Sequence, residues 1–239
     1  MKRTVLITGA ARRIGRGIAE ALARTGWDVV VHACRATAEA EALCAALAAG
    51  AGVRAWRVAG DLAAEGGPDA VFEAALTQTG RIDALVNNAS LFARQPLACA
   101  TAADFDRQWR VNALAPMLLT QRLAGHLDRR EAAGCAVNLL DQRIARPDAA
   151  AVPYLVSKKA LEAYTLAAAR AFAPRLRVNA VAPGAVLPPA DEAAREAAGA
   201  FPLSARPSVG QVADAVRFLL EAEATTGQIL FVDGGQHLL

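Results

Sequence analysis

The stretch TGAARRIGRG at residues 8–17 decides the fold expected of this chain. It follows a short apolar run at residues 4–8 and opens a helical pattern from Ile14 to Thr25. Glycines at such a junction let the backbone turn sharply and approach a phosphate group at the N-terminus of the helix. An ordinary strand-to-helix turn is the alternative, but the position after the first strand favours a dinucleotide-binding turn.

The rest of the chain alternates short β-rich runs with longer Ala- and Leu-rich helical segments. Strands are predicted at residues 28–32, 53–58, 84–87, 136–140, 177–181 and 228–232, and helices at 37–49, 69–79, 102–126, 154–172 and 209–220. Pro116 is expected to kink or split the helical segment 102–126. This alternation predicts an α/β protein, a Rossmann-type doubly wound sheet of about seven parallel strands with helices on both faces. Residues 1–239 are expected to form a single domain.

Composition narrows the class of protein further. Of the 239 residues, 54% are hydrophobic and 21% charged, which supplies a large core. The net charge of +3 is scattered along the chain, so a nucleic-acid partner is not expected. No apolar run reaches the length of a membrane span, and we expect a soluble, cytoplasmic protein without membrane contact. The four cysteines form no metal-ligand or CxxC spacing, so we expect no metal site and buried free thiols.

The end of the second strand bears on the choice of cofactor. NAD-specific sites place an acidic residue there to bind the ribose 2′-hydroxyl, and this chain has none before Glu39. Arg35 stands there instead and can meet a 2′-phosphate through charged hydrogen bonds. The alternative is that Arg35 is a solvated residue at the start of a helix. We predict that NADPH is the cofactor.

Tyr154 and Lys158 form a YxxxK pair on a predicted helix. Residues i and i+4 share one helix face, so the phenol and the ammonium group are expected to lie close together. A nearby cation favours the ionised form of a tyrosine and suits it to proton transfer. An ordinary surface pair is the alternative reading.

These motifs together resemble the short-chain dehydrogenase/reductase family over essentially the whole chain. The glycine-rich turn is similar to the family's TGxxxGxG, with Arg13 in place of the middle glycine. Asn112 matches the family's helix asparagine, residues 87–89 (NNA) match a segment beside the cofactor, and Asp61 matches a residue that contacts adenine. The resemblance implies cofactor binding by Gly9, Arg13, Ile14, Gly15, His32, Arg35, Asp61, Leu62, Asn88, Ala89, Ser90, Tyr154, Lys158, Pro183 and Gly184, and it suggests a homotetramer.

One departure from the family pattern is informative. The family's catalytic serine lies about thirteen positions before the tyrosine, and here that position is Asp141. A carboxylate would repel a developing alkoxide but can accept ring N–H groups and help relay a proton. Together with Arg13, Ser90 and Phe92, this residue makes the chain resemble the pteridine reductases within the family, although Phe92 alone would more readily be read as a core residue.

The pteridine-reductase resemblance implies hydride transfer from NADPH to a C=N carbon of a pterin or dihydrofolate-type substrate. Catalysis is expected from Asp141, Tyr154, Lys158 and Asn112, and substrate binding from Ser90, Phe92, Asp141 and Tyr154. Three alternatives stay open: a short-chain reductase of a non-pterin carbonyl or imine, a non-catalytic NADPH-binding regulatory protein, and a decayed site. Residues 188–202 are interpreted as a flap over the substrate site, with Ala and Glu residues that could form a short helix.

Overall fold

The computed structural model describes residues 2–146, 149–187 and 201–239. Seven strands form one parallel sheet in the order β3-β2-β1-β4-β5-β6-β7. The strands are β1 (Thr4–Ile7), β2 (Asp28–Ala33), β3 (Ala55–Ala59), β4 (Ala84–Asn87), β5 (Gly134–Leu139), β6 (Leu176–Pro183) and β7 (Ile229–Val232). The predicted Rossmann-type doubly wound sheet is confirmed, with each expected strand found within two residues of its predicted start or end.

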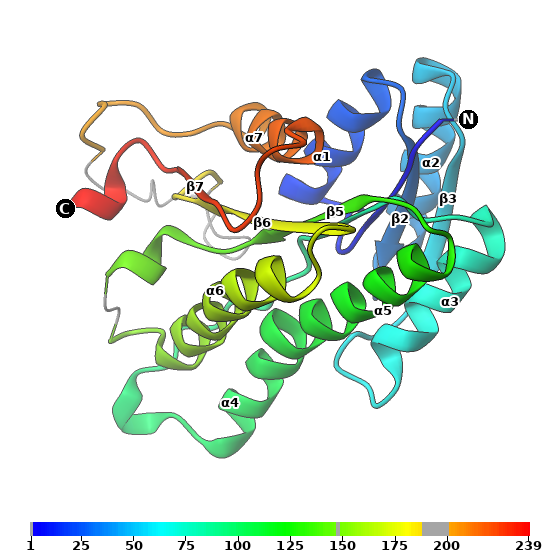
Figure 1. The fold of residues 1–239 in the computed structure, drawn as a ribbon. Helices are drawn as coiled ribbons and strands as arrows, with labels where there is room; N and C mark the ends of the chain where they lie inside the picture. The colour runs from blue at the N-terminus through cyan, green and yellow to red at the C-terminus, as the bar shows by residue number, and fades with distance from the viewer. Residues whose placement is uncertain (1, 147–148, 188–200) are drawn as a thin grey trace.

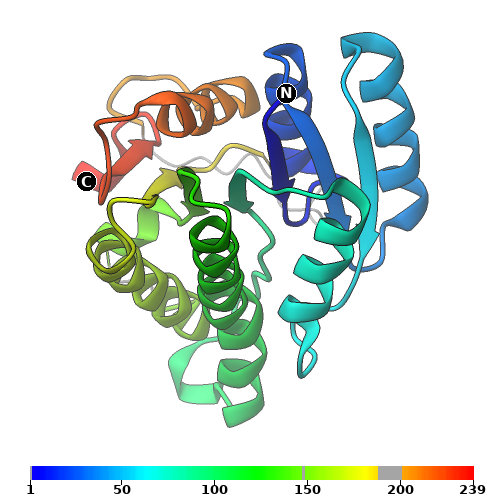
Figure 2. The same cartoon turned by 45° about the vertical axis from the view of Figure 1, so that its right-hand side comes forward.

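Helices cover both faces of this sheet (Figures 1 and 2). One layer holds α1 (Arg13–Arg24), α2 (Thr37–Ala51) and α7 (Val209–Glu221), and the other holds α3 (Gly67–Thr79), α4 (Ala102–Trp109), α5 (Ala115–Arg129) and α6 (Val152–Ala171). Each layer buries a separate set of apolar side chains against the sheet. Strands such as β1, β2 and β4 are buried at every position, because a sheet covered on both faces has no solvated side.

The long helical segment is divided as its proline predicts. The α-helical hydrogen bonding ends at Trp109, residues Arg110–Leu114 form a π-helical turn, and α5 begins at Ala115. Pro116 lacks a backbone N–H and its ring would crowd the carbonyl four residues earlier, so the helix widens there. The helical path continues through this π-helical turn, and Asn112 lies at the centre of the turn.

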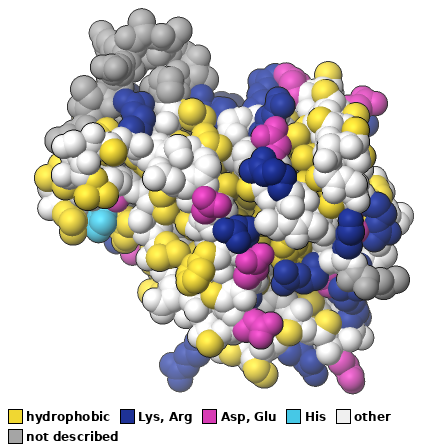
Figure 3. Space-filling model, turned by 90° about the horizontal axis from the view of Figure 1, so that it is seen from above, with side chains coloured by type: hydrophobic (Ala, Val, Ile, Leu, Met, Phe, Trp, Pro, Cys, Tyr) yellow, Lys and Arg dark blue, Asp and Glu magenta, His cyan; other side chains and the backbone are white. Residues whose placement is uncertain are grey.

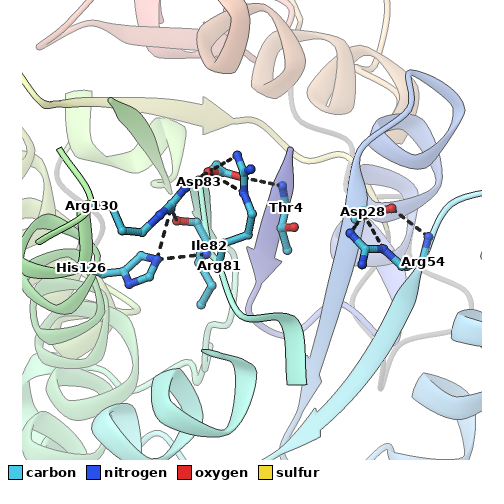
Figure 4. A network of polar contacts seen from close by, with 8 residues as sticks. All are labelled: Thr4, Asp28, Arg54, Arg81, Ile82, Asp83, His126 and Arg130. Atoms are coloured by element: carbon cyan, nitrogen blue, oxygen red, sulfur yellow. Dashed lines mark hydrogen bonds and ion pairs between the residues drawn. The ribbon is translucent and has the colours of Figure 1, made fainter. Parts of the chain in front are cut away.

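Two buried carboxylates hold the amino ends of neighbouring strands together (Figure 4). Asp28, at the start of β2, accepts the backbone N–H of Arg54 at 2.8 Å and a hydrogen bond from its guanidinium group at 2.7 Å. Asp83, just before β4, accepts the backbone N–H of Thr4 at 2.9 Å. In both places one carboxylate joins the starts of two neighbouring parallel strands.

The surface carries charges of both signs. On the face in Figure 3, Lys and Arg side chains are interspersed with Asp and Glu. In the part of the chain that the structure describes, no helix is both long and apolar enough to cross a bilayer. All four cysteines are free, but the expectation that they are buried holds only for Cys135, because Cys44 is half-buried and Cys34 and Cys99 are exposed. Cys34 directly follows the carboxyl end of β2, and Cys99 ends a short 3-10 turn on the surface.

Candidate active site

A cavity of about 590 Å³ opens at the carboxyl edge of the sheet. Its walls come from the segments that follow β1, β2, β3 and β4 and from the end of α4. The chain winds outward from β1 in both directions, so the segments after β1 and β4 diverge and leave a crevice between them. Eleven of the residues predicted to bind the cofactor line this cavity: Gly9, Arg13, Ile14, Gly15, His32, Arg35, Asp61, Leu62, Asn88, Ala89 and Ser90.

The turn after β1 requires its glycines. Gly9 adopts φ +63°, and a Cβ atom on Gly15 would lie 2.4 Å from the carbonyl oxygen of Gly9. Arg13 adopts φ +55° although it is not a glycine. This left-handed conformation costs an ordinary residue roughly 1–2 kcal/mol, which explains why a glycine is usual at this position. The backbone is therefore tightly folded where a pyrophosphate would approach it.

Two side chains brace this turn from the neighbouring strands. The Nδ2 atom of Asn88 donates to the carbonyl oxygens of Thr8 and Gly9 at 2.9 and 3.0 Å. The Nδ1 atom of His32 accepts the N–H of Gly9 at 3.2 Å, and its Nε2 atom lies 3.1 Å from the carbonyl oxygen of Gly60. Burial lowers the pKa of His32, against opposing effects of the Gly60 hydrogen bond and the charge of Asp61. His32 thus stays neutral and fixes the turn rather than binding through charge.

Among the residues that the structure describes, four arginines line the cavity: Arg12, Arg13, Arg35 and Arg107. The sequence interpretation missed Arg12 and Arg107. Arg12 forms an ion pair with Glu39, which draws this exposed guanidinium group towards the first turn of α2. Arg107 lies on α4, one helical turn before Val111, and no motif marks it. Four guanidinium groups around a glycine-rich turn fit a dinucleotide that carries several phosphates.

Tyr154 and Asp141 meet beside this cavity. The hydroxyl of Tyr154 donates to Oδ2 of Asp141 at 2.9 Å. Asp141 directly follows the strand region of β5, and Tyr154 lies in the first turn of α6. The side chain of Tyr154 is almost fully buried. The thirteen-residue spacing between the two positions therefore brings a carboxylate to the tyrosine hydroxyl.

The expectation that Lys158 favours the ionised form of Tyr154 is wrong. Burial first, then the charge and hydrogen bond of Asp141, raise the pKa of Tyr154 well above its usual value of 10. Lys158 donates to the carbonyl oxygen of Leu139 at 2.7 Å, and its Nζ atom lies 5.8 Å from the centre of the tyrosine ring. Burial lowers the pKa of Lys158 to about 8, with the charge of Asp141 opposing it. Tyr154 is therefore a neutral phenol at pH 7.

Phe92 is not a core residue, because 45% of its surface is exposed. Its ring meets that of Tyr154 edge to face at a centroid distance of 4.8 Å. The guanidinium carbon of Arg143 lies 5.2 Å from the centre of the Phe92 ring, and its Nη1 atom lies 3.1 Å from Oδ2 of Asp141. Arg143 was missed by the sequence interpretation, since no spacing rule connects it with Phe92.

Asn112 links the loop after β4 to helix α6. Its Oδ1 atom accepts the N–H of Leu91 at 2.7 Å and the hydroxyl of Ser90 at 3.1 Å. Its Nδ2 atom donates to the carbonyl oxygen of Leu91 at 2.8 Å and to Oγ of Ser157 at 3.1 Å. With two bonds donated and two accepted, Asn112 uses its full capacity within the protein. The geometry gives it a positioning role for the segment that carries Ser90 and Phe92.

Four residues predicted to bind the cofactor are not among those that line the cavity: Tyr154, Lys158, Pro183 and Gly184. Gly184 follows β6, where a Cβ atom would lie 2.8 Å from the Cα atom of Asp233, so close packing of the C-terminal segment explains this glycine. Pro183 ends β6. Their contact with a cofactor stays a prediction. The expected flap at residues 188–202 lies largely outside the described residues.

A doubly wound sheet, a braced glycine-rich turn and a buried tyrosine near a lysine define a Rossmann-type oxidoreductase. The model of the family described as enoyl-(acyl carrier protein) reductase matches residues 9–237, and the chain belongs to this family of short-chain dehydrogenases/reductases.

Relatives of this chain have different named substrates. The chain is 35% identical to granaticin polyketide synthase putative ketoacyl reductase 2 from Streptomyces violaceoruber, over 98% of this chain and 96% of that protein. It is 32% identical to pteridine reductase 1 from Leishmania tarentolae, over 98% of this chain and 96% of that protein. It superposes with a TM-score of 0.90 on FolM alternative dihydrofolate reductase 1 from Brucella suis in complex with NADP, at 35% identity over 99% and 96% of the two chains.

Proposed function

We propose that this protein uses NADPH to reduce a C=N bond in a pterin or dihydrofolate-type substrate. The observation that carries the proposal is the hydrogen bond from Tyr154 to Asp141, where a serine is usual in the family. A carboxylate at this place favours a substrate with ring N–H groups over a ketone, whose reduction builds negative charge on oxygen. The similarity to a pteridine reductase and to an alternative dihydrofolate reductase supports the same choice.

The cofactor preference rests on charge. Arg12, Arg13 and Arg35 lie in one wall of the cavity, and Glu39 is paired with Arg12. A 2′-phosphate is favoured over a 2′-hydroxyl in such surroundings. The Brucella suis neighbour, which was solved with NADP, supports this assignment.

In the proposed reaction, the bound cofactor supplies a hydride to the carbon of the C=N bond. Tyr154 holds the proton that the ring nitrogen takes up, and the raised pKa keeps this phenol protonated before the reaction. Asp141 fixes the hydroxyl of Tyr154 at 2.9 Å, and Phe92 offers an exposed ring face for stacking a flat substrate. Lys158 is a buried ammonium group beside Tyr154 that can offset the negative charge left on the phenol.

The main competing function is reduction of a carbonyl or imine unrelated to pterins. The relative named as a ketoacyl reductase favours this reading. Its weakness is Asp141, which places a negative group where an alkoxide would develop. A non-catalytic NADPH-binding role is a third candidate, and any NADPH turnover would exclude it.

A substrate panel tests these candidates side by side. NADPH oxidation is followed with biopterin, dihydrobiopterin, dihydrofolate and simple ketones, for the wild type and for Asp141→Ser. We expect turnover of at least one pterin-type substrate and a loss of about 10²-fold or more in the serine variant, the usual scale for a positioned acid–base group. Unchanged pterin turnover in Asp141→Ser, with an unchanged melting curve, would return the protein to the reductases of unassigned substrate.

Phe92→Ala separates stacking from packing. If the ring stacks on the substrate, KM rises by about tenfold, in line with 1–1.5 kcal/mol for an aromatic pair, while NADPH affinity is unchanged. A fall in melting temperature without a change in KM would instead assign Phe92 to packing.

The homotetramer implied by the family resemblance is part of the proposal. Apolar side chains are exposed on three helices, and large examples are Trp109, Val156, Leu166 and Phe218. Burial of such side chains between copies would account for their exposure in a single chain. Sedimentation of the purified protein tests it, and a monomer at micromolar concentration would contradict it.

A further inference from the structure

The carboxylate of Asp141 has no unused acceptor position in the free protein. Oδ1 accepts the backbone N–H of Arg143 at 2.8 Å and lies 3.3 Å from its Nη1 atom. Oδ2 accepts the hydroxyl of Tyr154 at 2.9 Å and lies 3.1 Å from the same Nη1 atom. A carboxylate offers about four lone-pair positions, and four contacts are present. A substrate N–H group can therefore reach Asp141 only if one of these donors leaves.

The side chain of Arg143 is the donor best able to leave. The backbone N–H of Arg143 is part of the chain, and the Tyr154 hydroxyl is held on a buried helix face. The side chain of Arg143 is 31% exposed, and the contacts of its guanidinium group at 3.1 and 3.3 Å are the longest of the four. Arg143 and Asp141 are both only partly exposed, so their ion pair is stronger than a fully solvated one and opens only where another donor takes its place at Asp141. The other two hydrogen bonds still hold Asp141 in place.

The guanidinium group also lies over Phe92, at 5.2 Å from its ring centre. It thus occupies the space between the aromatic ring and the carboxylate, which the proposed function assigns to a flat substrate. Arg143 is a planar N–H donor beside an aromatic face, as a nitrogen heterocycle would be. The internal ion pair and the proposed substrate complex compete for the same two groups.

We propose that Arg143 is an internal competitor for Asp141, and that a substrate enters by exchanging its own N–H donor for the Arg143 guanidinium group. This inference rests on the proposed function and names the feature that the substrate must have, an N–H group beside the reducible C=N bond. A simple ketone has no such donor and cannot release Arg143. The ion pair therefore acts as a specificity device as well as a way to neutralise a partly buried carboxylate.

The test compares Arg143→Ala with Arg146→Ala. Both variants lose one positive charge from the same short segment, but Arg146 donates to the carbonyl oxygen of Gln236 at 3.3 Å rather than to Asp141. With dihydrobiopterin as substrate, Arg143→Ala lowers KM by about fivefold, as loss of a competing pair of this kind predicts. Its NADPH affinity stays within twofold of wild type, and Arg146→Ala leaves KM unchanged. An unchanged or raised KM in folded Arg143→Ala overturns the proposal.

Arg143→Met serves as a second variant, because it keeps an apolar stem over Phe92 and removes the charge. If both variants fold, both must lower KM. If the alanine variant does not fold, the methionine variant decides by the same outcome.

A substrate-free measurement separates this inference from the proposed function. Methylguanidinium at millimolar concentration binds Arg143→Ala and raises its melting temperature, because it refills the vacated contact with Asp141. It does not bind the wild type or the double variant Arg143→Ala/Asp141→Asn. Equal shifts in all three proteins overturn the exchange, whatever the substrate proves to be. Absence of pterin turnover in the wild type, with this binding pattern intact, overturns only the pterin assignment.

Discussion

The two edges of this sheet use the same residue types in opposite ways. At the amino edge, Asp83 receives hydrogen bonds from Thr4, Arg81 and Arg130, and its side chain is nearly inaccessible (Figure 4). At the carboxyl edge, Asp141 is paired with Arg143 beside an exposed aromatic ring.

The difference lies in what holds the partners. At the amino edge the donors stand on, or next to, strands and on helix α5, so the carboxylates join elements that cannot move apart. At the carboxyl edge Asp141 and Arg143 both lie on the segment that connects β5 to α6. Charges fixed by rigid elements stabilise the fold, and charges held by connecting segments remain available to a ligand. A substitution can be made at one edge without changing the other. Loss of stability or loss of binding and turnover then shows which role the substituted group has.

The largest effect is expected at the carboxyl edge, from Tyr154→Phe. The variant keeps the ring and its contact with Phe92 but removes the hydroxyl that holds the transferable proton. We expect kcat to fall by about 10³-fold, within the range of a general acid, with little change in melting temperature. Tyr164→Phe is the matched control on the same helix, because the Tyr164 hydroxyl donates to the carbonyl oxygen of Met117 at 3.0 Å. A comparable loss of kcat in the control would show that the readout follows helix packing rather than proton transfer.

At the amino edge, Asp83→Asn should damage stability and leave function intact. Burial alone would raise the pKa of Asp83, but hydrogen bonds from Arg81, Thr4 and Arg130 together lower it below its usual value. Removal of one partner from such a cluster costs about 3 kcal/mol of unfolding free energy. Urea unfolding measures this loss, and NADPH affinity at 20 °C should be unchanged. Asp106→Asn, which breaks an exposed pair with Arg110, should cost less than about 1 kcal/mol.

The lowered pKa of Asp83 also makes the stability of the fold depend on pH in the acid range. Because the folded-state pKa of Asp83 is lowered, its contribution is complete above the unfolded value of about 4 and is lost as pH falls through the lower folded value. A wild type and an Asp83→Asn variant whose stability differed equally at pH 7 and at pH 2 would contradict this account.

The sequence predicted the carboxyl edge better than the amino edge, for a physical reason. Local spacing identifies the turn at residues 8–17 and the pair Tyr154 and Lys158, since a glycine-rich turn and an i,i+4 pair are short-range patterns. Asp83 and Arg130 are 47 residues apart and meet only because β4 and α5 pack together. Arg143 was missed for the same reason, since its aromatic partner Phe92 is far away in the chain. The pKa of Tyr154 was predicted in the wrong direction because burial, which no spacing reveals, outweighs the neighbouring cation.

The next smaller effect is the difference in affinity between NADPH and NADH, which depends on residues at the carboxyl edge. NADPH should bind more tightly than NADH by about 1.5–3 kcal/mol, the scale of a charged hydrogen bond. Arg35→Ala should remove most of this difference by weakening NADPH binding while NADH binding stays constant. Arg24→Ala makes the same change of charge at the far end of α1 and should alter neither affinity. Calorimetry with both nucleotides decides the matter, and equal affinities in the wild type would contradict the role of Arg35.

The smallest effect concerns two histidines, one at each edge. His126 accepts the N–H of Ile82 at 3.2 Å, as His32 accepts that of Gly9 at 3.2 Å. Burial lowers the pKa of both, and the charges of Arg130 and Arg129 lower that of His126 further, against Asp83 and Glu73. Each folded-state pKa lies below the unfolded value of about 6.5, so the unfolded chain takes up protons first and stability falls as pH drops below that value. His126→Gln keeps an acceptor for Ile82 and should flatten the decline in unfolding free energy between pH 7.5 and 5.5. Nucleotide affinity should not change in this variant.

His32→Gln should instead flatten the decline in NADH affinity over the same range, because protonation of His32 would release the turn at Gly9. NADH is the better probe here, since it lacks the 2′-phosphate, which itself titrates near pH 6. If His126→Gln altered NADH affinity as much as His32→Gln does, the two edges would be coupled through the sheet, and their separation into a stabilising edge and a binding edge would fail.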